Sequence, residues 1–264
     1  LRGAALARPA LPATDPAPRL SGGGPLSEVV ALEPGEEAVT IASLDPDAPP
    51  LALGTAQGVV KRVTPGDVPG NRDEWEVIGL KDGDTVVGAA PATDADELVF
   101  VSSDASLLHF DASAVRPQGR PAGGMAGIRL ADGQRVAFFG VVPAVVRGRG
   151  VVGTVAGSSD ALPGTQTGAG KVTPYELYPG KGRGTGGVRA HRFLKGEDAL
   201  IHAGGGPGPA RGPRGGPAAI RGNFELGGFA DSTERGQKPL PGAEFTIAEM
   251  LKKKEGIKKK EKTQ

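Results

Sequence analysis

The chain has 264 residues, a formal net charge of +1 and no cysteine, which excludes disulfides and cysteine-ligated metal sites. Glycine (44) and proline (24) are abundant, yet residues 32–203 are rich in valine, leucine and alanine and can bury an aliphatic core. The sequence has no apolar run long enough to span a bilayer, and its first residues lack the apolar segment of a signal peptide. We therefore expect a cytoplasmic protein.

The small net charge hides a strong asymmetry along the chain. Residues 29–111 contain four basic and 16 acidic side chains, whereas residues 112–195 contain 12 basic and three acidic ones. Seven lysines and two glutamates follow in residues 252–264. This separation produces an oriented field, and a polyanion would be drawn to the basic half.

Three pairs of β-prone runs are predicted to form hairpins. In LALGTAQGVVKRVT (51–64), two such runs flank a turn at Gly58, which supplies the positive φ that a tight turn needs. LVFVSSDASLLHF (98–110) repeats this design around Ser103-Asp104. VVGTVAGSSDALPGTQ (151–166) is a weaker third copy.

An apolar–turn–apolar unit recurs along the chain, centred on Gly35, Gly83, Gly133 and Gly196. The spacings of 48, 50 and 63 residues indicate a propeller-type or solenoid array. Each hairpin leads into one such unit, so a repeat should contain about four short strands. Three complete repeats are expected, at residues 35–83, 84–133 and 134–196.

The repeats divide the chain into three regions. Residues 1–24 are rich in proline, alanine and glycine and are expected to form an irregular end, cut from a preceding blade, with one strand in LRGAALARPALP. Residues 25–203 should hold the blades. Residues 204–264 combine a Gly/Pro-rich linker with a lysine-rich tail and are expected to be largely disordered.

Other local signals argue against an enzyme. GTQTGAGKV (164–172) is like a phosphate loop, but its spacing is one residue too long and Val172 stands where Ser or Thr would hold magnesium. The histidines lack metal-ligand spacing and are expected to be packing or rim residues, and Trp75 should pack inside a blade. The histidines are His109, His191 and His202.

Three segments resemble one known family. GTAQGVVKR, VRPQGRPAGGMAGIRLADGQRV and KVTPYELYPGKGRGTGGVRAHRFLKGEDAL are similar to the C-terminal repeat domain of the A subunit of bacterial type IIA topoisomerases, DNA gyrase and topoisomerase IV. The resemblance covers residues 22–202. It implies an all-β fold, the β-pinwheel. This fold is a propeller-like array of four-stranded blades that exchange strands with their neighbours, and in this chain the ring of blades could be incomplete. It also implies a basic rim that binds and bends duplex DNA.

Two departures from the family pattern shape the functional expectation. The breakage–reunion domain with its active-site tyrosine is missing, and Tyr175 and Tyr178 lie in a loop of the last clear repeat. The chain is therefore expected to be non-catalytic by itself, with ATP and Mg²⁺ implied only for the whole enzyme. The gyrase-specific Gln-Arg-Arg-Gly-Gly-type box is also missing. Its absence favours a topoisomerase IV-like domain, or a gyrase-like one cut before its box.

A DNA-binding rim needs spaced cations together with glycines that let phosphates approach the backbone amides. With no base-reading element evident, we expect weak sequence preference. The partners that the resemblance implies are duplex DNA, the rest of the A subunit, and the ATPase B subunit; the implied location is nucleoid-associated. The candidate DNA-binding residues are Lys61, Arg62, Arg116, Arg120, Arg129, Lys171, Lys181, Arg183, Arg189 and Arg192.

Three alternatives remain open at this point. A lone arginine is better explained as a solvated surface charge, and it is the recurrence in Gly-rich loops that favours DNA. A propeller-type protein-interaction module would use acidic or apolar loops, which the acidic residues 29–111 could supply. An enzyme on a propeller needs titratable groups or metal ligands at the hub, and the sequence indicates none.

Overall fold

The computed structural model describes residues 4–6, 38–64, 74–160, 169–207 and 243–246. Helix in these ranges is confined to short 3₁₀ turns, η2 (Ala112–Ala114), η3 (Ala144–Arg149) and η4 (Tyr175–Leu177). None of their helices has the length and apolarity needed to cross a bilayer. The unit around Gly35 and the lysine-rich residues 252–264 lie outside the described residues.

Strands make up nearly all of the regular secondary structure in the described residues, which confirms the all-β prediction. Nearly all of them belong to three antiparallel four-stranded sheets, ordered β5-β2-β3-β8, β9-β6-β7-β12 and β13-β10-β11-β14. The strands are β1 (Ala4–Leu6), β2 (Leu51–Thr55), β3 (Val59–Val63), β4 (Glu74–Glu76), β5 (Val86–Pro91), β6 (Glu97–Ser102), β7 (Ser106–Asp111), β8 (Met125–Ala126), β9 (Val136–Val142), β10 (Gly150–Gly157), β11 (Ala169–Pro174), β12 (Val188–Arg189), β13 (Ala199–Pro207) and β14 (Ala243–Thr246).

The sheets exchange strands in the way that the resemblance implied. β8 follows β7 along the chain but pairs with β3, and β12 follows β11 but pairs with β7. β4 follows β3 and pairs with β1, so it makes the same backward step. Glycine is required where the exchanged strands dock. Gly124 and Gly187 have φ of 83° and 73°, and a Cβ on either would lie within 2.7 Å of a carbonyl oxygen of the receiving strand.

Two of the three predicted hairpins are confirmed, and the third is displaced. β2–β3 and β6–β7 turn through positive φ at Gly58 (82°) and Ala105 (63°). β10 lies where a strand was expected, but its partner is β11, beyond the predicted limit at residue 166. The second strand of this hairpin therefore lies later in the sequence than expected, and residues 169–172 of the apparent phosphate loop are part of it.

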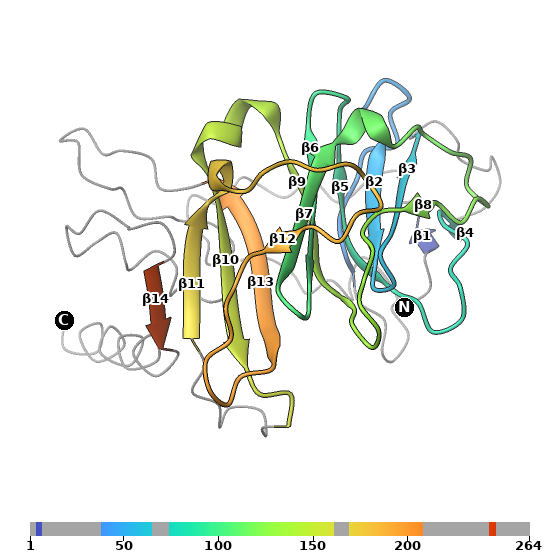
Figure 1. Cartoon of the computed structure of the whole chain (residues 1–264). Helices are drawn as coiled ribbons and strands as arrows, with labels where there is room; N and C mark the ends of the chain where they lie inside the picture. Colours follow the sequence, from blue (N-terminus) through green and yellow to red (C-terminus); the bar gives the residue numbers. More distant parts are fainter. Residues whose placement is uncertain (1–3, 7–37, 65–73, 161–168, 208–242, 247–264) are drawn as a thin grey trace, which may run out of the picture.

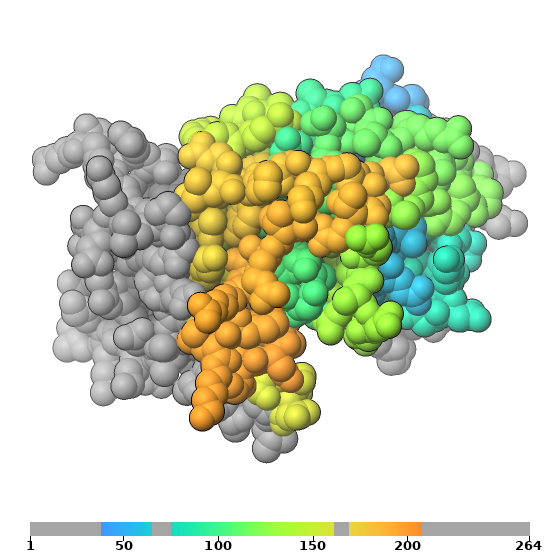
Figure 2. All heavy atoms as spheres, in the orientation of Figure 1, coloured from blue at the N-terminus to red at the C-terminus, as the bar shows by residue number. Residues whose placement is uncertain are grey.

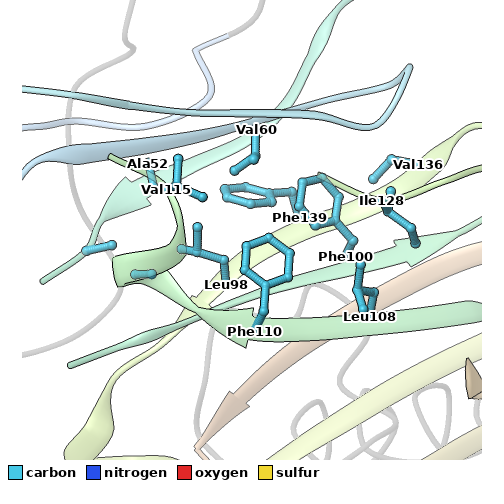
Figure 3. Packing of buried hydrophobic residues seen from close by; sticks show 12 residues of the cluster. Ala52, Val60, Leu98, Phe100, Leu108, Phe110, Val115, Ile128, Val136 and Phe139 are labelled. Carbon is cyan, nitrogen blue, oxygen red and sulfur yellow. The ribbon is translucent and has the colours of Figure 1, made fainter. Parts of the chain in front are cut away.

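The cores lie between the sheets, because the middle sheet is buried on both faces. Successive side chains of a strand point to opposite faces. Leu98 and Phe100 of β6 accordingly join a cluster shared with the first sheet, and Val99 and Val101 join one shared with the third. Figure 3 shows the first of these clusters, in which the ring centroids of Phe100 and Phe139 are 4.8 Å apart. A third cluster buries Trp75, as predicted.

The three sheets stand side by side, with the first at the right and the third at the left of Figure 1. β9 packs against both β5 and β13, each of which is the edge strand opposite the exchanged one. The inner edges therefore converge, and the exchanged strands and their loops lie on the outside. Gly88 of β5 permits this approach, since a Cβ there would lie 2.4 Å from the carbonyl oxygen of Phe139.

Replacing Gly88 by alanine should therefore destabilise the fold. The added methyl group meets backbone that cannot rotate away, and overpacking of this kind costs about 1–3 kcal/mol or more. Urea unfolding measures the loss. Gly148→Ala is the matched control, because a Cβ at Gly148 meets nothing within 4 Å. Equal midpoints for the two variants would contradict this account of the inner edge.

His202 of β13 should make stability depend on pH. Burial lowers the pKa of His202 below its ordinary value of 6.5. The unfolded chain then binds the proton more readily, so stability is fully present above about pH 6.5 and is lost as the pH falls toward the folded-state pKa. Free energies of unfolding at several values between about pH 5 and pH 7 should show a rise that His202→Gln reduces. An unchanged pH slope in the variant would count against this role.

Candidate nucleic-acid interface

Two Gly-rich basic loops occupy equivalent places on neighbouring sheets. We call residues 116–129 the first basic loop and residues 179–192 the second. Gln118 N donates to Arg62 O at 2.8 Å as the first loop leaves η2, and Lys181 N donates to His109 O at 3.1 Å as the second leaves η4. Corresponding positions in the two loops are therefore 63 residues apart.

At this offset of 63 residues, basic residues of the first loop correspond to basic residues of the second. Arg120 matches Arg183, and both side chains are partly buried. Arg129 matches Arg192, and both are exposed. The remaining exposed cations in the loops are Arg116, Lys181 and Arg189.

The two loops also touch one another. Arg183 Nη1 donates to Ala126 O at 2.6 Å, and Gly184 N donates to Gly127 O at 2.6 Å. Arg129 N donates to Thr185 O at 3.0 Å. In Figure 2 the orange segment of the second loop runs across the front of the molecule and meets the green first loop. The loops therefore form one continuous basic surface over two blades.

Lys61 and Arg62 do not belong to this surface, which corrects the expectation that they are rim cations. Their side chains are 0% and 2% exposed. β3 lies inside a sheet that is covered on both faces, so neither of two consecutive side chains reaches solvent. Arg62 donates to carbonyl oxygens of three residues and forms an ion pair of 2.6 Å with Asp94. The three carbonyls are those of Ala92, Ala112 and Val115, at 3.0–3.2 Å.

Lys171 is also engaged with the fold. It lies in β11 and is partly buried, and its Nζ donates to Ala190 O at 2.9 Å. It therefore braces the end of the second basic loop from behind. Seven of the ten sequence candidates remain on the basic surface: Arg116, Arg120, Arg129, Lys181, Arg183, Arg189 and Arg192.

Sequence reasoning missed a buried polar cluster between the second and third sheets. Glu97 accepts a hydrogen bond of 2.6 Å from the Tyr175 hydroxyl. His109 Nδ1 and Arg147 Nε lie 3.3 and 3.4 Å from the same carboxylate. Burial, followed by the bond to Glu97, raises the pKa of Tyr175. Aligning the repeats could have revealed His109, which occupies the place of Arg62 and approaches Tyr178 O at 2.9 Å.

This cluster joins blades and does not form a metal site. The described ranges contain no group of three or more His, Asp or Glu side chains placed to hold an ion. The three histidines fit the predicted packing role, since His109 and His191 are 6% and 1% exposed and His202 is partly buried. Within the described residues, the basic surface is thus the strongest candidate site.

Comparison with known proteins assigns the family. The model of the DNA gyrase C-terminal domain, described as a β-propeller, matches residues 96–143 and 164–204. Over these ranges the chain matches this family. The DNA gyrase A subunit of Mycobacterium tuberculosis (strain H37Rv) is 32% identical over 192 residues, which are 71% of this chain and 21% of the relative. The DNA gyrase A subunit of Salmonella typhimurium is 31% identical over 184 residues, 69% of this chain and 20% of the relative.

Solved structures support the fold of this gyrase-type domain. The C-terminal domain of DNA topoisomerase IV matches with a TM-score of 0.58 and 20% identity, over 70% of this chain and 55% of that one. A DNA gyrase A C-terminal domain gives 0.51 and 24%, over 67% and 56%. The chain spans about a fifth of the length of the curated relatives it matches. The β-pinwheel assignment is confirmed, and the preference for topoisomerase IV over gyrase stays a prediction.

Arg62→Met should cost much more stability than the same change at Arg116. The first leaves three buried carbonyls without their donor, and each unpaired group costs about 1–3 kcal/mol. We expect a loss of at least about 3 kcal/mol for Arg62, and within about 0.5 kcal/mol for exposed Arg116. Urea unfolding compares the two. A small loss at Arg62 would show that the loop entry does not need the guanidinium.

Proposed function

We propose that this chain binds and bends duplex DNA as the non-catalytic C-terminal domain of a type IIA topoisomerase A subunit. Its task is to present DNA for ATP-dependent strand passage by the whole enzyme. The observation that carries the proposal is the continuous basic surface, on which Arg120 and Arg129 of one blade are repeated as Arg183 and Arg192 on the next.

The surface has the chemistry that a phosphate backbone requires. Lysine and arginine neutralise phosphates and release counterions, which supplies most non-specific affinity. Glycines in both loops leave room for phosphates to approach backbone amides. Bending a short duplex costs of order 1–6 kcal/mol, so a bend needs several contacts acting together. The cations of the two touching loops supply several such contacts over two blades.

The proposal carries further expectations about the whole enzyme. Its protein partners are the rest of the A subunit, together with the ATPase B subunit. ATP and Mg²⁺ act there and not on this chain. Sequence preference should be weak, since phosphate contacts carry no sequence information directly. The parent enzyme would work on DNA in the cytoplasm, associated with the nucleoid.

Duplex affinity across a salt series tests the proposal. With about six to eight phosphate contacts, the wild type should lose about 10³- to 10⁴-fold in affinity between about 50 and 200 mM salt. Arg129→Ala/Arg192→Ala removes two exposed cations and should lower the slope of log affinity against log salt by about two.

Arg135→Ala/Arg149→Ala is the matched control. It removes the same charge from two exposed residues outside both loops and should leave the slope nearly unchanged. A shallow wild-type slope, or an equal loss in the control, would refute the proposed surface. The protein-interaction module would then be the better interpretation of the chain.

A further inference from the structure

We propose that Lys61 is a positioning residue for DNA binding. Its buried ammonium fixes the first basic loop in the shape that presents Arg116 and Arg120. The inference rests on the proposed function, but it concerns a residue that cannot itself reach DNA, because its side chain is 0% exposed.

The contacts of Lys61 go mainly to the loop. Its Nζ donates to Arg120 O and Ala122 O, both at 2.7 Å, and to Val77 O at 2.8 Å. A lysine ammonium has three N–H donors, so these three carbonyls use all of them. Hydrogen bonds from a charged donor are roughly twice as strong as neutral ones. Two strong bonds therefore hold the loop backbone at Arg120 and two residues beyond it.

These bonds act on a tight turn of the loop. Ala122 N donates to Gly119 O at 3.2 Å, which closes the turn around Arg120. Gly79 N donates to Ala122 O at 3.3 Å, so this carbonyl accepts from two elements at once. The backbone of Arg120 is thereby anchored, and its guanidinium extends from a fixed point. Arg62, the next residue of β3, holds η2 and the entry to the same loop.

The second basic loop is built on the first. Its Arg183 and Gly184 donate to carbonyls of residues 126 and 127. Within itself it is held by bonds of 2.8 Å from Lys181 Nζ to Gly187 O and 2.9 Å from Thr185 Oγ1 to Gly182 O. A displacement of the first loop would therefore carry over to the second.

The equivalent positions of the three blades show that the fold does not by itself require a lysine at this position. Hairpin register places Lys61 opposite Leu53, and the same position of the next two blades holds Leu108 and Lys171. A fully buried leucine thus suits this position in the middle sheet. Since burying an ammonium is costly unless all its donors are satisfied, the cation at Lys61 is best explained by the carbonyls of the loop.

Lys61→Met in the 264-residue chain tests the inference, in a cycle with Arg116→Ala/Arg120→Ala. Lys61 is buried and releases no counterion itself. If it positions the loop, Lys61→Met should lower the salt slope by about two, as loss of both arginines does. The arginine pair should then cost almost nothing further in the Lys61→Met background. Hydrogen exchange should rise in peptides that cover residues 116–124.

Leu98→Ala is the control for lost stability, because Leu98 is 0% exposed in the core and belongs to neither basic loop. It should leave the salt slope and the exchange of residues 116–124 unchanged. Should Lys61→Met not fold, Lys61→Gln keeps two N–H donors and should give an intermediate slope.

The outcomes separate the two proposals. A steep wild-type slope that Lys61→Met retains, with additive effects of the arginine pair, would overturn the positioning role and leave the DNA surface standing. A wild type without salt-sensitive binding would overturn the proposed function and, with it, the role of Lys61 toward DNA. A lowered slope with unchanged loop exchange would also contradict the inference, because the loop would then have kept its shape.

Discussion

The return of each outer strand to the preceding sheet is the constraint on which the rest of the structure depends. β8 and β12 form only two ladder pairs each, and strands this short cannot hold their place by pairing alone. The chain on either side must be secured by other contacts. Positive-φ glycines let each strand approach its neighbour, and buried side chains hold the loop that leads into it.

Those buried side chains differ between the two crossings, which are the segments that lead from η2 to β8 and from η4 to β12. In the first, four hydrogen bonds join buried cations to the backbone. Arg62 donates to the carbonyls of Ala112 and Val115, and Lys61 donates to those of Arg120 and Ala122. In the second, His109 takes the place of Arg62, and Lys171 reaches only the end of the loop. The first crossing is thus held by two buried side chains of β3, the strand with which β8 pairs. The second gains part of its order by docking onto the first.

Much of the fold could be predicted from the sequence because its signals are local. Alternation and a glycine turn define the hairpin at 51–64, and the repeated Gly turns at 83, 133 and 196 all have φ above 70°. The burial of Lys61 could not be predicted in this way. Its carbonyl partners at Arg120 and Ala122 lie 59 and 61 residues away. From the sequence, a basic side chain between valines of one strand is expected to be exposed. It is buried here because a second sheet covers that face.

The sequence candidates are exposed where they recur in the two basic loops, as at Arg129 and Arg192, and their role in DNA binding stays a prediction. The expectation of exposure is wrong where repetition has another cause. Lys61 and Lys171 recur at one strand position, but both are engaged with backbone carbonyls of the basic loops, those of Arg120 and Ala122 for Lys61 and that of Ala190 for Lys171. The basic residues that repeat along this chain therefore fall into two sets, one exposed on the loops and one bonded to backbone carbonyls of the fold. Only contacts distinguish them.

The acidic half of the chain has a similar explanation, which bears on the protein-interaction alternative. Several of its carboxylates cap turns instead of forming a free surface. Asp84 accepts from Gln57 N at 2.9 Å. Asp96 accepts from Ala144 N at 3.0 Å and from Thr93; although partial burial opposes it, these bonds lower the pKa of Asp96. Carboxylates used in this way are explained by the fold, so the acidic composition by itself gives little support to a protein-binding face. The basic half differs because Arg129 and Arg192 recur at exposed positions of loops that already meet.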